Sequence, residues 1–405
     1  MAVAPSVRRR NSSMIVFTYS GQGSQEPGMG AAWREHPSWE LVEEASEEAG
    51  RDLAHLLLDA DADELRQTRN AQLATFLTSM VILDAVERVG VDAAGHAGHS
   101  LGEYSALTAA GALDFGGAIG LVVERGEAMQ SAASERVGTM AAILGLDDEG
   151  VEAACEATAG DVWVANFNAP GQVVIAGDPD AVIAAGEAAR EAGAKRITSL
   201  EVSGAFHTPF MASAGDRLRV AVDEADVRPP EGIVVANVDA LEHDDPEAWR
   251  SLLNAQLTRP VRWHQSLQRL SDLGATTFVE LGPGNVLTGL VKRTFKEARR
   301  LTVNTPDHLD RLLEELATTP EAAPPELHEG EHLFATERLV VSPCAGVFTP
   351  IQDLAVGGAV SAGQLLGKIG NEEVRSPFAG MLMGWLALDT ERVTSSQPIA
   401  WLQVA

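Results

Sequence analysis

The protein has 405 residues, which is enough for two or three domains with buried cores. Its 58 acidic and 30 basic side chains give a net charge of −28, which argues against nucleic acid or an anionic membrane as a partner, because both repel a negative surface. Two cysteines, Cys155 and Cys344, are too few for a disulfide framework or a cysteine-rich zinc site. The longest apolar stretch, residues 73–86, is too short to cross a bilayer, and residues 1–17 contain no signal-peptide core. We therefore expect a cytoplasmic protein.

The first part of the chain alternates between short apolar runs and helical periodicity. Residues 1–13 carry three consecutive arginines without an ordered pattern, and we expect them to be disordered. Residues 14–19 predict a buried strand that runs into a Gly-rich turn, and helical spacing follows at 39–50, at 71–88 and after residue 101. A strand, a tight turn and a helix in succession predict an α/β layer structure.

A different pattern between residues 138 and 204 predicts a smaller unit. Its elements are expected in the order strand, helix, strand, strand, helix, strand, at 139–145, 147–158, 162–167, 172–176, 179–192 and 197–202. This order is typical of a ferredoxin-like fold. We expect it to be a subdomain inserted into a large α/β domain that comprises residues 14–137 and 205–317.

The last part of the chain changes in composition. Residues 318–332 are rich in proline and glutamate, which predicts a semi-extended linker, because such a segment cannot bury enough apolar area to become ordered. Residues 333–405 contain short apolar runs between glycines and prolines, and the segment 342–346 matches 376–380. This internal repeat predicts a small all-β domain with two similar halves.

Residues 98–102 read Gly-His-Ser-Leu-Gly and satisfy the G-x-S-x-G pattern of a nucleophile elbow. Glycines permit a strained turn that exposes the serine hydroxyl, here Ser100, and the following helix directs backbone N–H groups at developing negative charge. The same pattern also occurs in ordinary strand–helix turns.

A serine nucleophile needs a base. His207 follows the predicted return from the small subdomain, which would place it at the cleft between the two domains; the alternative is an exposed loop histidine. His96 and His99 flank Ser100, but neighbours along a strand point to opposite faces, so we do not expect either to be the base.

Together with other motifs in the same order, this elbow resembles the malonyl-CoA:acyl-carrier-protein transacylase family over about residues 14–317. The motifs that carry the resemblance are Gly-Gln-Gly-Ser-Gln at 21–25, Gly-His-Ser-Leu-Gly-Glu at 98–103, Arg125, Asn-Phe-Asn-Ala-Pro-Gly-Gln at 166–172, His207, Gln256–Leu257 with Pro260–Val261, and Gly-Pro-Gly at 282–284. The resemblance implies an α/β-hydrolase-like large domain with the inserted subdomain. Ser20 departs from the pattern, because a proline usually precedes the first motif.

The resemblance implies a ping-pong transfer of a malonyl group from malonyl-CoA to the phosphopantetheine thiol of an acyl carrier protein, in fatty acid or polyketide synthesis. Ser100 would form the acyl-enzyme and His207 would act as general base and then acid. A main-chain carbonyl, that of Gln256, would orient His207. The backbone N–H groups of Gln22 and Leu101 would form the oxyanion hole. No cofactor or metal is implied, because coenzyme A enters as the substrate's thioester.

Arg125 lies on an otherwise apolar helix face, where a buried guanidinium must find an anion. A salt bridge within the protein is one explanation; the resemblance implies the free carboxylate of the malonyl group, gripped by two N–H donors. By the same resemblance, Phe206 would crowd the methyl group of a branched acyl chain. Asn166 and Arg196 would lie near coenzyme A or the carrier arm.

Residues 339–404 resemble a biotinyl/lipoyl-type barrel-sandwich domain. Such carriers present a modified lysine at a hairpin tip within a flanking motif. The corresponding hairpin at 367–373 is shorter, and Lys368 precedes its turn without that motif. We therefore expect neither biotin nor lipoate, and predict a docking or assembly module for a protein partner.

Two other functions stay open on the sequence. A serine esterase or thioesterase would share the elbow, but Arg125 and the inserted subdomain argue against it. A carrier or scaffold would hold a prosthetic group on its C-terminal domain beside an inactive front domain.

Overall fold

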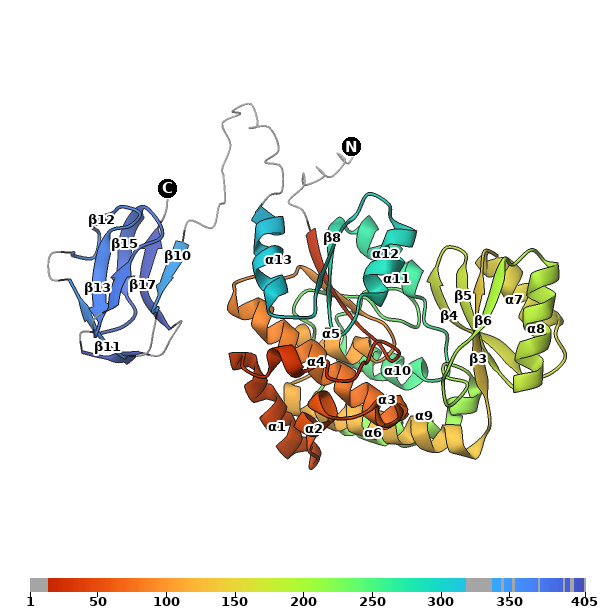
Figure 1. Ribbon diagram of the computed structural model, residues 1–405. Helices are drawn as coiled ribbons and strands as arrows, with labels where there is room; N and C mark the ends of the chain where they lie inside the picture. Colours follow the sequence, from red (N-terminus) through yellow and green to blue (C-terminus); the bar gives the residue numbers. More distant parts are fainter. Residues whose placement is uncertain are drawn as a thin grey trace, which may run out of the picture. The chain divides into compact units, whose positions relative to one another are not determined.

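The computed structural model describes residues 14–317, 337–343, 346–351, 354–370, 372–388, 390–393 and 397–403. The chain forms two compact units, one up to Thr319 and one from Pro320 onward (Figure 1). The expected lead-in 1–13, the expected linker 318–332 and Cys344 lie outside the described residues. Of the helices in the described part, none is long and apolar enough to cross a membrane.

A five-stranded parallel sheet forms the centre of the first unit. Its order is β7-β2-β1-β8-β9, with every pair of neighbours parallel. The strands are β1 (Met14–Tyr19), β2 (Gly95–Gly98), β7 (Ile233–Val234), β8 (Ala275–Leu281) and β9 (Arg299–Val303). Parallel strands end at one edge of a sheet, and Tyr19 at the end of β1 is in register with Gly98 at the end of β2. The Gly-rich turn after β1 and the elbow after β2 therefore lie side by side.

Helices pack on both faces of this sheet, which makes the unit a mixed α/β structure. Phe17 and Tyr19 of β1 point into a core shared with α4, α5 and α6, whereas Val16 points into a second core with α11 and α12. The α-helices of the large part are α1 (Glu40–Ala49), α2 (Leu53–Leu58), α3 (Ala62–Arg66), α4 (Thr68–Arg88), α5 (Gly102–Ala109), α6 (Phe115–Glu135), α9 (Ala212–Glu224), α10 (Pro246–Gln256), α11 (Trp263–Asp272), α12 (Val286–Thr294) and α13 (Asp307–Ala317). Short 3₁₀ turns are η1 (Ala31–Trp33), η2 (Pro37–Trp39) and η3 (Pro209–Met211).

Between α6 and η3 the chain builds a second, antiparallel sheet with its own core (Figure 1). The elements follow in the order β3 (Thr139–Leu144), α7 (Asp148–Ala157), β4 (Val162–Ala169), β5 (Gln172–Gly177), α8 (Pro179–Glu191) and β6 (Arg196–Ser199). The sheet order is β4-β5-β3-β6. Gly171 turns the chain between β4 and β5 with a φ of 71°, a conformation that glycine adopts without strain. A parallel bridge between Asn166 and Val261 joins β4 to the large part.

The second unit is all β in its described residues. Its two four-stranded sheets have the orders β10-β17-β15-β12 and β14-β13-β11-β16. The strands are β10 (Glu337–Val341), β11 (Gly346–Pro350), β12 (Ala359–Val360), β13 (Leu365–Ile369), β14 (Glu372–Arg375), β15 (Gly380–Trp385), β16 (Arg392–Val393) and β17 (Pro398–Gln403). Residues of both sheets, among them Phe348 and Leu402, share one core. Lys368 is exposed on β13, where it lies opposite Glu373 of β14 in the strand register.

Candidate active site

The turn after β2 holds Ser100 in a strained conformation. Its φ of 54° lies in the left-handed region that side-chain-bearing residues rarely adopt. The chain passes so close to its neighbours here that a Cβ on Gly98 would lie 1.7 Å from the carbonyl oxygen of Gly102, and one on Gly102 would lie 2.1 Å from that of Tyr19. Both glycines of the pattern are therefore required by space, and Ser100 is presented at the start of α5.

Ser100 and His207 form a hydrogen-bonded pair. The Ser100 Oγ and the His207 Nε2 are 2.7 Å apart, and the His207 Nδ1 lies 2.9 Å from the main-chain oxygen of Gln256. A carbonyl can only accept, so Nδ1 carries the proton and Nε2 is free to take the serine's. His207 also has a positive φ, of 61°. The structure thus brings together three groups that the sequence analysis named, and the tautomer of His207 follows from their positions.

Arg125, on α6, contacts the same hydroxyl. Its Nη2 donates to the Ser100 Oγ at 3.1 Å and to the Gln256 Oε1 at 2.8 Å, and its Nη1 donates to the Gln72 Oε1 at 2.6 Å. The guanidinium is almost completely buried and lies over the ring of Tyr104. These three acceptors are neutral oxygens, so the guanidinium can still take an anion as a direct hydrogen-bond partner.

Burial strongly affects the acid–base chemistry here. Burial, and next the positive charge of Arg125, lower the pKa of His207 to about 3, while the Gln256 carbonyl acts in the opposite direction. His207 is therefore a neutral imidazole at physiological pH, the form that accepts a proton. Burial also lowers the pKa of His99.

A cavity of about 280 Å³ opens onto the pair between the large part and the second sheet. Its wall includes Ser100, His207, Gln22, Asn166 and Phe206. The geometry thus brings together most of the residues predicted from the sequence. Four predicted residues are not on this wall: Arg196 is exposed at the start of β6, whereas Arg125, Leu101 and Gln256 are buried next to Ser100.

The expectation that His99 points to the opposite face from Ser100 is wrong. His99 lines the same cavity, where its Nε2 donates to the Asn168 Oδ1 at 2.8 Å. The alternation rule holds only within a strand, and β2 ends at Gly98, before the turn that Ser100 makes. His96, still within β2, is buried and bonded to the Tyr19 hydroxyl at 2.9 Å.

Sequence reasoning missed two residues that hold the elbow. The Asn237 Oδ1 accepts from the Ser100 N–H at 2.7 Å, and its Nδ2 donates to the Gly98 oxygen at 2.7 Å. Glu103 accepts from the backbone N–H of Asn237 and from the Gln256 side chain. Glu103 ends the motif at 98–103, but the sequence analysis gave its side chain no role; no signal marks Asn237.

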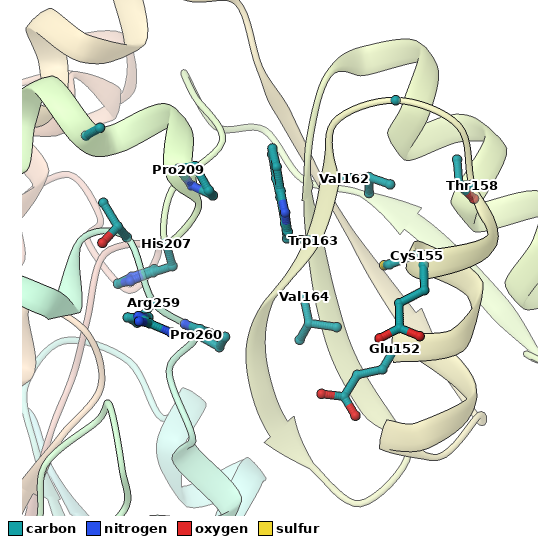
Figure 2. Close-up of a pocket in the computed structure, with 14 residues that line it drawn as sticks. Glu152, Cys155, Thr158, Val162, Trp163, Val164, His207, Pro209, Arg259 and Pro260 are labelled. Carbon is teal, nitrogen blue, oxygen red and sulfur yellow. The ribbon is translucent and has the colours of Figure 1, made fainter.

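A larger cavity, of about 790 Å³, touches His207 from another direction (Figure 2). It lies between Pro209, Arg259 and Pro260 on one side and Trp163 with Glu152 on the other. Neither Ser100 nor Gln22 is on its wall. The hydroxyl of Ser100 and the imidazole of His207 therefore meet in the smaller cavity. In the residues that the structure describes, no cluster of His, Cys, Asp or Glu side chains fits a metal ion.

Comparison with known families assigns the part of the chain that contains this site. Residues 16–317 match the family model described as an acyl transferase domain. The chain belongs to the acyl transferase family. This match covers both the central sheet and the antiparallel sheet, with every predicted site residue inside it.

Close relatives have more specific names. The malonyl CoA-acyl carrier protein transacylase of Bacillus subtilis (strain 168) is 40% identical over 309 residues, which are 75% of this chain and 98% of that protein. The protein of the same name from Escherichia coli (strain K12) is 41% identical over 75% of this chain and 99% of its own length.

Solved structures agree with these relatives. An acyl carrier protein S-malonyltransferase from Vibrio cholerae has a TM-score of 0.72 and 42% identity, covering 74% of this chain and all of that one. A malonyl-transacylase in complex with a type II PKS acyl-carrier protein has a TM-score of 0.72 and 40% identity, covering 75% of this chain and all of that one. The family model ends at residue 317, before the second unit begins.

Proposed function

We propose that the protein transfers a malonyl group from malonyl-CoA to the phosphopantetheine thiol of an acyl carrier protein, through an ester on Ser100. The observation that carries the proposal is the convergence of an imidazole and a guanidinium on one hydroxyl, at 2.7 and 3.1 Å. A serine hydrolase needs the imidazole but not the guanidinium. The relatives named above favour this function over an esterase or a scaffold.

In the first half-reaction, Ser100 attacks the thioester carbonyl while His207 Nε2 takes the hydroxyl proton. The oxyanion is stabilised by backbone N–H groups, for which we propose Leu101 and Gln22; the N–H of Ser100 is already bonded to Asn237. Collapse breaks the C–S bond, and the imidazolium returns the proton to the leaving coenzyme A thiolate. The carrier's thiol then gives its proton to His207 and attacks the Ser100 ester. The C–O bond of the ester breaks, the imidazolium returns the proton to the Ser100 oxygen, and the carrier leaves with the malonyl group.

The other predicted residues have supporting roles in this proposal. Arg125 binds the free carboxylate of the malonyl group, and the Gln256 carbonyl keeps the His207 ring in place, as its 2.9 Å contact supports. Phe206 limits the width of the cavity, and a wall of this kind discriminates one methyl group by about 1–3 kcal/mol. Asn166 contacts the pantetheine arm from the cavity wall, whereas Arg196, exposed on β6, contacts the coenzyme A phosphates or the carrier.

We also infer the finer organisation of the chain. An α/β-hydrolase-like large domain (14–137 and 205–317) with a ferredoxin-like insertion (138–204) is supported by the two sheets and their separate cores. A barrel-sandwich domain (333–405) is supported by the pair of four-stranded sheets around one core. Because Lys368 lies within β13 and not at the tip of a turn, we propose that this domain carries no biotin or lipoate and binds a protein.

Intact-mass spectrometry tests the function. The purified protein, incubated with malonyl-CoA, should gain one malonyl group, and Ser100→Ala should gain none. Addition of an acyl carrier protein should move that group to the carrier. Loss of the group to water without a carrier would indicate a hydrolase. A permanent mass increment on residues 333–405 would indicate a carrier domain.

A further inference from the structure

One buried carboxylate, that of Glu103, connects the groups of the site. Glu103 lies on α5, three residues after Ser100, and is fully buried. Its Oε1 accepts from the backbone N–H of Asn237 at 2.6 Å, and its Oε2 accepts from Nε2 of Gln256. Both donors are neutral. The transfer mechanism above assigns Glu103 no step.

The Gln256 side chain links this carboxylate to Arg125. Its Nε2 donates to Glu103 and, at 2.9 Å, to the main-chain oxygen of Ser100. Its Oε1 accepts from the Arg125 Nη2 at 2.8 Å. An ionised carboxylate only accepts and a guanidinium only donates, so the amide can be oriented in one way alone. Glu103 and Arg125 are thus the negative and positive ends of one buried hydrogen-bonded unit.

The charged and titratable groups around Glu103 come from three elements. Arg125 on α6 lowers its pKa, Asp239 in the loop after β7 raises it, and Tyr104 is its neighbour on α5. Burial is the largest effect and raises the pKa of Glu103 to about 7, against the hydrogen bonds from Asn237 and Gln256. Burial raises the pKa of Tyr104 to about 12, so this phenol stays neutral.

We propose that Glu103 is the internal counter-charge of Arg125, and that it takes up a proton when the free carboxylate of a malonyl group binds this guanidinium. The inference rests on the proposed function. With the cavity empty, one negative and one positive charge balance. A second carboxylate leaves an excess negative charge in a site shielded from water, where like charges disfavour each other's ionised form. The proton comes from solvent and returns to it when the malonyl group moves to the carrier.

The sign of the pH effect follows from this exchange. Because the malonyl carboxylate raises the pKa of Glu103, protonation of Glu103 must in turn favour malonyl binding. The KM for malonyl-CoA should therefore rise with pH through the pKa of Glu103, by up to about tenfold for each unit of that upward shift. Acetyl-CoA has the same phosphates but no free carboxylate, so its affinity should not share this rise. Glu103 acts through Gln256, which makes it a positioning and charge-balancing residue.

Steady-state kinetics of the full chain from about pH 6 to about pH 9 test this proposal. The measured quantity is the ratio of the malonyl-CoA KM to the acetyl-CoA KM, or to its inhibition constant where turnover is slow. The ratio should rise with pH in the wild type and be flat in Glu103→Gln, which cannot titrate. In Asp239→Asn, which lacks the charge that raises the pKa of Glu103, the rise should move to lower pH. A flat ratio in the wild type, or the same rise in Glu103→Gln, would overturn the proposal.

Direct proton counting provides a second test that needs no variant. In weakly buffered solution near neutral pH, loading with malonyl-CoA should consume a fraction of a proton per active site, about half for a one-unit shift centred on the working pH. Loading with acetyl-CoA should consume none. Equal proton uptake with both thioesters refutes the role of Glu103. If the wild type gains no malonyl group by mass, the proposed function itself fails, and the two failures are thereby distinguished.

Discussion

At the residue scale, the proposed carboxylate-binding role of Arg125 can be tested directly. Its three hydrogen bonds go to the side chains of Gln72, Gln256 and Ser100, so its orientation is fixed before substrate arrives. Arg125→Ala should lower kcat/KM for malonyl transfer by about 100-fold or more, the range for truncating one partner of a buried charge pair, and acetyl transfer far less. Arg66 is exposed, so Arg66→Ala is the control and should change kcat/KM for neither malonyl nor acetyl transfer. Equal losses for both thioesters would remove the carboxylate-binding role.

The second prediction concerns how the acylation rate depends on the protonation state of His207. Since burial and Arg125 lower its pKa to about 3, the imidazole stays unprotonated well below neutral pH. The acylation rate at saturating malonyl-CoA should hold its neutral-pH value down to about pH 5. Arg125→Ala should move the acid limb to higher pH, because Arg125 is one cause of the lowered pKa. Rapid-quench mass spectrometry measures this rate; a wild-type midpoint near the ordinary histidine value of 6.5 would contradict the prediction.

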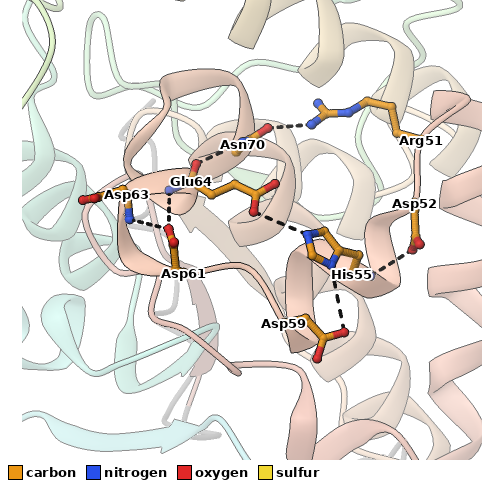
Figure 3. A network of polar contacts seen from close by, with 8 residues as sticks. All are labelled: Arg51, Asp52, His55, Asp59, Asp61, Asp63, Glu64 and Asn70. Carbon is orange, nitrogen blue, oxygen red and sulfur yellow. Dashed lines mark hydrogen bonds and ion pairs between the residues drawn. The ribbon is translucent and has the colours of Figure 1, made fainter.

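At the scale of elements, the short helices α2 and α3 depend on their caps (Figure 3). Asp61 Oδ1 accepts from the backbone N–H groups of Asp63 and Glu64, both at 2.9 Å. Asp61→Ala should lower the free energy of unfolding by about 1 kcal/mol, measured by urea denaturation. Asp63→Ala is the matched control: its side chain is exposed and forms a surface ion pair with Arg66, so the change should stay within about 0.5 kcal/mol. Equal effects would exclude capping as the cause.

The antiparallel sheet illustrates how element boundaries depend on pairing. The sequence predicts a last strand at 197–202, whereas β6 is Arg196–Ser199. The paired residues are the four of β6, from Ser199 opposite Ala141 to Arg196 opposite Leu144 on β3. Leu200 and Val202, apolar like a strand residue, instead line the catalytic cavity. The hydrophobic pattern is the same for both uses, so the sequence could not separate them.

On the scale of the whole molecule, every residue assigned to the transfer lies in the first of the two compact units. A chain ending at residue 319 should therefore fold and accept malonyl from malonyl-CoA at a rate within about twofold of the full chain, since removal of a separate domain leaves the other's core intact. The acylation rate measured by mass spectrometry tests this. A large loss of rate in a folded, truncated chain would show that the second unit contributes to the reaction.

The sequence by itself determined the expected reaction and the positions of many helices and strands along the chain. The strand Met14–Tyr19 has its predicted bounds, and the helix predicted at 71–88 is α4, three residues longer at its start. Ser100, His207 and the Gln256 carbonyl could be singled out because local motifs mark them. Such motifs record what one stretch of backbone must do, for example the space that Gly98 and Gly102 leave.

Only the tertiary structure decided how these pieces connect. Glu103 meets Asn237 across 134 positions and Gln256 across 153, and no local pattern encodes where two distant loops arrive. The same is true of His99, which faces the cavity because its strand ends one residue earlier. Hydrogen bonds over such separations depend on how the sheet and helices pack around them, and that packing is a property of the whole fold.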